Sequence, residues 1–416
     1  MCVLLGERMN KSSGTSQGGM MLHSLIFLFV VSTYERQLRS CCSLHETTTD
    51  GTGEQSRWQR RTEKRRQRTE ELLNSIEFGT SLSLLPEQQP QELCNLKIPT
   101  LKSSTIDWDK IGAELDPIRG GKLREGSLRG LRKRAQVEAF HFVVSEILNA
   151  QQCANNPQSG VTIIDAGCGA GNLGVSLAGL SYSSSIDTKV LAVDVNEHAL
   201  TRLSNRAEDI LSPEKIKTVC ADLADYDLII SKVPPDHSVV VVSLHACGAA
   251  SDMAMLLAIR CNAPFILCPC CTAKSLTKRI PSSNAEERTT FDLSASFQRS
   301  GASADIEYPR SRWLKGMLYN NDVADMALEE KYTLLAKVAD IGLGPQTMSQ
   351  QRQQQARAKK IVELDRLLAA SEDYGYDVRL MRIKNHDPLV YSKGDLLIGG
   401  KDIAETLINL PEEDEQ

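Results

Sequence analysis

Two apolar stretches of the chain end in residues that can do chemistry. Residues 238–246 read SVVVVSLHA and carry His245 near their end, and residues 264–270 read PFILCPC and close with Cys268 and Cys270. An imidazole exchanges protons near neutral pH, and a thiolate is both a nucleophile and a metal ligand. A buried strand needs neither group, so we expect a reactive site where these two stretches end.

The thiols of the second stretch allow three interpretations. With His245 and Cys247, the sulfurs of Cys268, Cys270 and Cys271 have the chemistry of zinc ligands. A thiolate can instead attack an acceptor, or the cysteines can line a substrate pocket as small residues. The H-x-C and C-x-C-C spacings lack a paired C-x-x-C, and adjacent residues of an extended chain point to opposite sides. We therefore predict no metal ligand.

We predict His245, Cys268 and Cys270 as the catalytic residues. His245 is the expected proton acceptor, because the pKa of an imidazole lies near neutral pH. Asp252, on the helix that follows, is placed to orient the ring of His245.

The elements that position these residues alternate between strands and helices. Short runs rich in Val and Ile predict buried strands, and apolar residues at three- and four-residue spacing predict helices. Such an alternation is typical of a parallel sheet covered on both faces, and the last two strands predict a hairpin at its edge. The predicted strands are 161–168, 189–195, 216–223, 238–246, 264–270, 376–383 and 395–401, and the predicted helices are 131–150, 196–211, 249–261 and 354–375.

A glycine-rich turn, IIDAGCGAGNLG, begins at the end of the first of these strands and opens a helix. Gly167, Gly169 and Gly171 let the backbone turn tightly and approach a ligand closely. Gly169, Gly171 and Gly174 also satisfy the G-x-G-x-x-G pattern of dinucleotide-binding proteins. Asp194, at the end of the next strand, suits the ribose hydroxyls of a dinucleotide and of S-adenosylmethionine (SAM) equally.

Three further features favour SAM. Asp165 ends the first strand, where a carboxylate can hold the amino-acid part of SAM. Asp222 lies at the end of the third strand, where it can bond the adenine amino group, and Leu223 can pack on the ring. The C-terminal strand pair also fits a methyltransferase better than a dehydrogenase. We therefore predict SAM as the cofactor, bound by Asp165, Gly167, Gly169, Gly171, Asp194, Asp222 and Leu223.

These motifs also carry a resemblance to a known family. IDAGCGAGNLG, VLAVDVN and ADL resemble class I SAM-dependent methyltransferases, and SLHACGAASD followed by ILCPCC resembles the methyltransferase domain 32 family. RKRAQVEAF, AKKIVELDRLLAASEDYGYDVRLMRI and SKGDLLIGG resemble other parts of that family, which includes glutathione S-transferase C-terminal domain-containing proteins and is related to a tRNA 2′-O-methyltransferase branch. The resemblance covers residues 105–405 in patches. It implies an α/β fold with a seven-stranded Rossmann-like sheet, helices on both faces and a C-terminal β-hairpin.

Two basic segments are candidates for contacts with the substrate. Residues 308–316, YPRSRWLKG, place Arg310 and Trp313 close together, a combination that can grip an RNA backbone and stack a base. The alternative is an amphipathic loop that packs Trp313 on the core. Arg132 and Lys133 lie at the basic start of the helix over 131–150. We predict these four side chains as substrate-binding residues on one basic rim.

The chain is expected to consist of a leader and one methyltransferase domain. The leader contains an apolar run, Met20–Val31, that resembles a targeting signal, and a basic run at 56–73. The basic run can bind nucleic acid or act as a nuclear signal, but we favour a solvated helix or a disordered arm. The expected boundaries are 1–104 for the disordered or targeting leader, 105–410 for the domain, 105–150 for its N-terminal helical cap and 275–349 for an insert.

Composition narrows the class of protein. The chain has 416 residues, of which 41% are apolar, so it can build a sizeable core. A net charge of −5 argues against nucleic-acid binding by the whole chain, though not by a local patch. The 12 cysteines lack regular spacing and indicate a reducing compartment. No stretch reaches the roughly 20 apolar residues of a membrane span, so we expect a cytoplasmic protein, or an organellar one if the leader is a targeting signal.

The leading hypothesis is a SAM-dependent methyltransferase that acts on RNA, a protein or a small molecule. One alternative is a catalytically inactive binding or scaffold module with the same fold, although the full set of predicted cofactor residues argues against it. The other alternative is an NAD-dependent Rossmann oxidoreductase.

Overall fold

The computed structural model describes most of the chain from Arg57 onward. Its two compact units are Met1–Lys64 and Arg65–Gln416, and the sheet with all strands belongs to the second. Met20–Val31 and most of the insert at 275–349 lie outside the described residues. These residues are 57–78, 98–103, 105–153, 160–180, 182, 187–208, 210–273, 306–319, 326–340, 349–384, 386 and 393–413.

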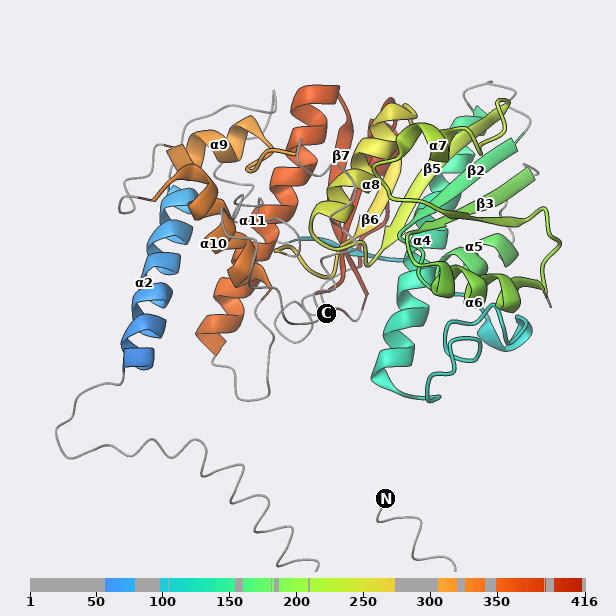
Figure 1. Ribbon diagram of the computed structural model, residues 1–416, viewed down its shortest axis with the longest axis horizontal. Coiled ribbons are helices and arrows are strands. Elements are labelled where there is room, and N and C mark those ends of the chain that lie inside the picture. Colours follow the sequence, from blue (N-terminus) through green and yellow to red (C-terminus); the bar gives the residue numbers. More distant parts are fainter. Residues whose placement is uncertain are drawn as a thin grey trace, which may run out of the picture. The chain divides into compact units, whose positions relative to one another are not determined.

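An eight-stranded sheet forms the centre of the second unit (Figure 1). Its order is β1-β7-β8-β6-β5-β2-β3-β4, in which β8 alone runs antiparallel to its two neighbours, β6 and β7. The strands are β1 Thr100–Leu101, β2 Gly160–Ala166, β3 Asp187–Asp194, β4 Ile216–Cys220, β5 His237–Leu244, β6 Phe265–Cys268, β7 Asp377–Ile383 and β8 Asp395–Gly400.

The observed sheet confirms the predicted α/β class and adds one strand. β7 and β8 form the expected hairpin, but β1 pairs in parallel with β7 and covers its outer edge. A two-residue strand has no periodicity of its own, so the sequence pattern gave no sign of it. Because β1 lies at Thr100–Leu101, part of the expected leader belongs to the sheet.

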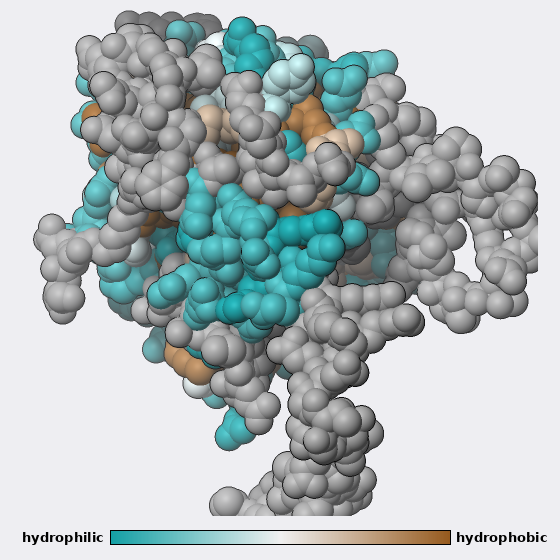
Figure 2. All heavy atoms as spheres, turned by 90° about the vertical axis from the view of Figure 1, so that its left-hand side faces the viewer, coloured by the Kyte–Doolittle hydropathy of each residue, from teal (hydrophilic) through white to brown (hydrophobic). Residues whose placement is uncertain are grey.

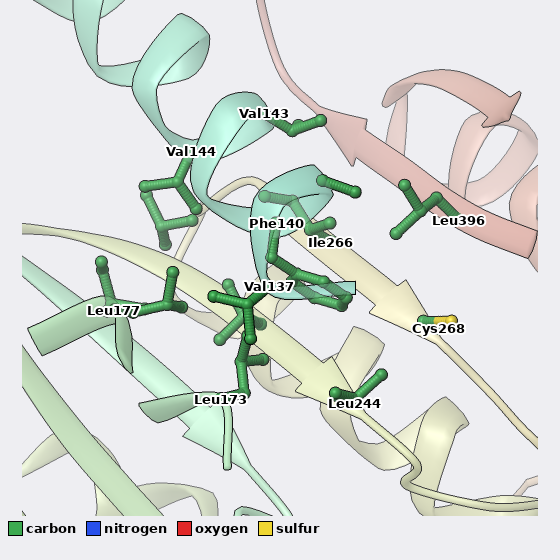
Figure 3. Packing of buried hydrophobic residues seen from close by; sticks show 14 of the residues in the cluster. Val137, Phe140, Val143, Val144, Leu173, Leu177, Leu244, Ile266, Cys268 and Leu396 are labelled. Atoms are coloured by element: carbon green, nitrogen blue, oxygen red, sulfur yellow. The ribbon is translucent and has the colours of Figure 1, made fainter. Parts of the chain in front are cut away.

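The central strands bury side chains on both faces, as a parallel sheet covered by helices requires, whereas the edge strand β4 is largely exposed. Alternate residues of β5 show this, since Val240 and Val242 belong to one core cluster and Val241 to the other. Figure 3 shows the first cluster, where Val137 and Phe140 of α4 (Leu128–Cys153) pack over the strands. The helices of that face are α4 Leu128–Cys153, α5 Gly174–Gly179, α6 Glu197–Glu208 and α12 Ala404–Ile408, and those of the other face are α7 Tyr226–Ile230, α8 Ala249–Arg260 and α11 Ser349–Tyr374.

A third apolar cluster joins α2 Arg57–Phe78, α9 Arg312–Tyr319 and α10 Leu328–Ala339 to α11. Leu72, Leu73 and Ile76 of α2 are buried in it. The opposite side of α2 is polar, with Gln67 and Glu71 exposed. Figure 2 faces the side that carries α2 and α9 in Figure 1, and the coloured centre of this face is mainly hydrophilic. The helix expected in the basic run therefore exists, but its second half is packed rather than solvated.

The segment that precedes α4 is mostly irregular. Residues 105–127 contain one turn of 3-10 helix, η1 Trp108–Lys110, so the expected N-terminal cap becomes helical only at α4. Asp116 organises this segment, because its buried carboxylate accepts hydrogen bonds from Arg119 at 2.8 Å and Arg134 at 2.6 Å. Within the described ranges, no helix is both long and apolar enough to cross a bilayer.

Candidate functional site

The carboxyl ends of β2 and β3 bring the glycine-rich turn and Asp194 together. The backbone amide of Gly169 donates to Asp194 Oδ2 at 2.8 Å, and the amide of Asn196 donates to Oδ1 at 2.8 Å. Gly169 and Gly171 have φ of +53° and +77°, values that a residue with a side chain rarely adopts. Asp194 thus fixes the turn, and each of its oxygens keeps a lone pair for a further hydrogen bond.

Asp165 lies at the end of β2 beneath this turn. Its side chain is buried, and Oδ2 has no hydrogen-bond partner within the described part of the chain. Burial raises the pKa of Asp165 to about 7, against a smaller opposing effect of the Gly174 backbone amide. A Cβ atom at Gly174 would lie 2.7 Å from Asp165 Oδ2, so a glycine is needed there. An unsatisfied buried carboxylate is costly unless a ligand group pairs with it.

A pocket of about 200 Å³ opens at this edge of the sheet. It lies where ligands bind in open α/β sheets, beyond the carboxyl ends of the strands. Predicted cofactor residues share it with residues that the sequence pattern did not single out, such as Ala250 and Met253 of α8. The residues that line it are Gly167, Asp194, Val195, Ala221, Asp222, Leu223, His245, Ala246, Cys247, Ala250 and Met253.

His245 lines this pocket and contacts the start of α4. Its Nε2 lies 2.5 Å from Nζ of Lys133, and its Nδ1 is buried with no hydrogen-bond partner within the described residues. Its backbone has φ of +76°, an uncommon value for a residue with a side chain. Burial, together with the positive charges of Lys133 and Lys393, lowers the pKa of His245 to about 4. His245 and Lys133, which were predicted for different roles, thus form one pair. Arg132, the neighbour of Lys133 in the sequence, is half-buried.

Asp252 does not orient His245, contrary to the prediction. Its buried carboxylate accepts hydrogen bonds from Arg310 at 2.9 Å, Arg366 at 3.1 Å and the hydroxyl of Tyr308 at 2.8 Å. These cations hold the pKa of Asp252 below its usual value despite burial. The carboxylate is therefore a structural link between α8, α11 and the segment before α9.

The predicted role of Arg310 and Trp313 as substrate contacts does not fit this arrangement either. The side chain of Arg310 is 8% exposed and is paired with Asp252. Trp313 is 1% exposed and belongs to the third apolar cluster. Neither side chain can face an RNA here, so the alternative of an amphipathic segment packed on the core describes 308–316 correctly.

The cysteines divide into two groups. Cys268 is the register partner of Leu244 and is buried with it in the first apolar cluster (Figure 3), and burial raises the pKa of Cys268 to about 12. A protonated core thiol does not fit the predicted catalytic role. The sulfurs of Cys247, Cys270 and Cys271 lie within 4.8 Å of one another at the pocket edge. β6 ends at Cys268, and the chain bends at Cys270. The expectation that adjacent cysteines point to opposite sides applies to an extended chain, so it does not hold for Cys270 and Cys271.

The central part of the chain matches a known protein family. Residues 132–278 match the family described as a methyltransferase domain. This match confirms the predicted resemblance over that segment, which contains the glycine-rich turn, His245 and the clustered cysteines.

Curated relatives cover different shares of the chain. The human glutathione S-transferase C-terminal domain-containing protein is 29% identical over 167 residues, which are 40% of this chain and 22% of the human protein. The homologue of Drosophila melanogaster is 25% identical over 330 residues, 78% of this chain and 45% of that protein. This chain therefore spans less than half of the length of these relatives. Among solved structures, magnesium protoporphyrin IX methyltransferase of Synechocystis PCC 6803 with bound SAH covers 42% of this chain and 75% of its own, with 18% identity and a TM-score of 0.23.

Proposed function

We propose that this chain is a SAM-dependent methyltransferase whose pocket at the carboxyl edge of the sheet holds SAM. The observation that carries the proposal is that one pocket is lined by residues at or just beyond the ends of three different strands, β2, β3 and β4: Gly167, Asp194, Asp222 and Leu223. The match of residues 132–278 to a methyltransferase domain family supports the same function.

The residues present suit the chemical groups of SAM. Asp194 has free lone pairs for ribose hydroxyls. Asp222 is half-buried in the pocket lining and can accept a hydrogen bond from an adenine amino group, and Leu223 offers an apolar surface for the ring. Asp165 has a buried oxygen without a partner, which fits the cationic amino group of the amino-acid part. When bound, SAM supplies a methyl group on a positively charged sulfur.

The chain then has to position an acceptor and remove its proton. We assign this role to His245 and Lys133, because His245 lines the pocket and its Nε2 contacts the Lys133 amine. Burial lowers the pKa of Lys133, which favours a neutral amine that can take up the proton released by the acceptor as it gains the methyl group. The hydrogen bond to Nε2 of His245 holds that amine in place. Neither metal nor a covalent intermediate is needed for such a transfer, since positioning and a base suffice.

The acceptor class is open to a direct experiment. Purified full-length protein is incubated with SAM labelled in the methyl group and with total cell extract, which is then treated with RNase or protease. Label that disappears with RNase identifies an RNA acceptor, label that disappears with protease identifies a protein, and label in the low-molecular-mass fraction identifies a small molecule. Absence of transfer to all fractions by a protein that binds SAM would contradict the proposed activity and favour an inactive binding module.

A further inference from the structure

Three thiols that the proposed methyl transfer does not use meet at the edge of the pocket. Cys247 follows β5, and Cys270 and Cys271 follow β6. The sulfurs of Cys247 and Cys270 are 2.8 Å apart, those of Cys270 and Cys271 are 3.6 Å apart, and all three lie within 4.8 Å of one another. Within the described ranges, no other three side chains of His, Cys, Asp or Glu bring their ligand atoms this close together.

The backbone around the thiols is fixed by several hydrogen bonds. The amide of Gly248 donates to the carbonyl of Cys271 at 3.0 Å, so the turn after β5 is tied to the turn after β6. The amides of Thr272 and Ala273 both donate to the carboxylate of Asp340 at 2.6 Å, which anchors the second turn to the end of α10. The three sulfurs are therefore held together by the fold and do not depend on one flexible loop.

The spacing of the sulfurs suits a common metal ion. Ligands about 2.3 Å from a tetrahedral zinc ion lie about 3.8 Å from one another. The 3.6 Å between the sulfurs of Cys270 and Cys271 is close to this value, and the 2.8 Å between those of Cys247 and Cys270 has to widen by about 1 Å to admit the ion. A disulfide between Cys247 and Cys270 would use only two of the sulfurs and leave Cys271 beside it. Thiolates are preferred ligands of zinc, and a divalent cation offsets the repulsion that three ionised sulfurs would otherwise create.

We propose that Cys247, Cys270 and Cys271 bind one Zn²⁺ ion at the edge of the pocket. Three protein ligands leave one position of a tetrahedral ion for a water molecule or for an atom of a bound acceptor. Cys247 lines the pocket, so the ion adjoins the place where we expect the acceptor. This site does not depend on the proposed function, because an inactive domain with the same turns would bind the same ion.

The test measures zinc in the untagged full-length protein, purified with a thiol reductant and without chelators. The protein is incubated with zinc sulfate, desalted and analysed by mass spectrometry for metals. Cys247→Ser and Cys270→Ser remove ligands, and Cys220→Ser is the matched control because Cys220 is an exposed thiol on β4, outside the group. The chain has 12 cysteines, so this comparison, and not the stoichiometry alone, locates the ion.

We expect about one zinc ion per chain in the wild type and in Cys220→Ser, and at least tenfold weaker zinc retention in the other two variants. Circular dichroism verifies that each variant is folded, and Co²⁺ substitution gives a second readout through the absorption of tetrahedral cobalt–thiolate sites. The proposal would be overturned by equal zinc retention in wild type and Cys270→Ser. It would also be overturned by a wild type that retains no zinc or that holds another metal in its place. SAM binding is measured on the same samples, so failure of the proposed function is seen separately.

Discussion

Burial controls the charge of Asp165 at the end of β2. The folded-state pKa is raised from 3.8 to about 7, so the native protein holds a proton that the unfolded chain releases near pH 4. The contribution of Asp165 to the free energy of unfolding therefore falls as pH rises from about 4 to 7, because the ionised carboxylate disfavours the folded state. A cationic ligand group reverses this preference, because it favours the ionised carboxylate.

The pH dependence of SAM affinity follows from that shift. If Asp165 pairs with the SAM amino group, binding releases a proton below pH 7, and affinity falls by up to tenfold per pH unit as pH decreases from 7 to 5. Isothermal titration calorimetry over this range measures it. Asp165→Asn should bind SAM more weakly at pH 7 and lose most of the pH dependence. An unchanged dependence in that variant would place Asp165 outside the cofactor site.

His245 and Lys133 are expected to act on the acceptor and not on SAM. His245→Gln or Lys133→Met should lower methyl transfer to the labelled fraction by about 100-fold, the effect typical of losing a positioned base. SAM affinity should change by less than about threefold. His237→Gln is the control, because His237 lies at the other end of the same strand and contacts Thr162. Transfer that persists in both variants would refute the role of this pair.

At the residue scale, the sequence identified the right strand ends but not every side chain's surroundings. Gly167, Asp194, Asp222, Leu223 and His245 meet in one pocket because parallel strands end at a common edge. The face of the sheet on which Cys268 lies depends on whether its position along the strand is odd or even. The surroundings of Asp252 depend on partners that are distant in the sequence. Asp252 finds two arginines separated from it by more than 50 residues, which no local pattern encodes.

At the scale of elements, the turn between β2 and α5 depends on Gly171. Its φ is +77°, and a Cβ atom there would lie 2.6 Å from Cγ of Leu203 on α6. Gly171→Ala should therefore lower the free energy of unfolding by about 1–3 kcal/mol. Urea unfolding checks this against Gly112→Ala, where an added Cβ meets nothing within 4 Å. Equal midpoints for both variants would show that the turn tolerates the substitution.

Element positions were predictable where the periodicity was long. The predicted helix 249–261 agrees with α8 Ala249–Arg260, and the predicted strand 376–383 agrees with β7 Asp377–Ile383. The predicted strand 264–270 was too long, because β6 ends at Cys268 and Pro269 follows. That difference decides the geometry of the cysteines, since the chain turns after Cys268 and brings Cys270 and Cys271 to Cys247.

At the scale of the whole molecule, a third apolar cluster ties α2 to the helices beyond the sheet. Leu73 is fully buried in it. Leu73→Ala should destabilise the protein by about 2–5 kcal/mol, while SAM affinity stays unchanged, because the pocket lies at the strand ends. A thermal melt and calorimetry measure the two effects. Ile408→Ala, at a side chain that is 75% exposed, is the control. A melting temperature equal to that of the control would mean that α2 adds nothing to stability.

The membership of α2 and β1 in the second unit's core could not be read from composition. The basic run at 56–73 resembles a solvated arm, and only the apolar side chains Leu72, Leu73 and Ile76 near its end hint at packing. The partners of those side chains lie more than 200 residues away in α9, α10 and α11. Long-range packing of this kind is decided by the complete fold.

Calorimetric titration of the purified full-length chain with SAM tests the central claim most directly. Asp194 anchors the turn and lines the pocket, so Asp194→Ala should weaken SAM binding by at least tenfold. Asp187→Ala is the matched control at the far end of the same strand, where the carboxylate pairs with Lys189 and Lys215 at the surface. We expect SAM to bind the wild type and the control alike. A folded wild type that binds NADH and not SAM, or neither, would contradict the account.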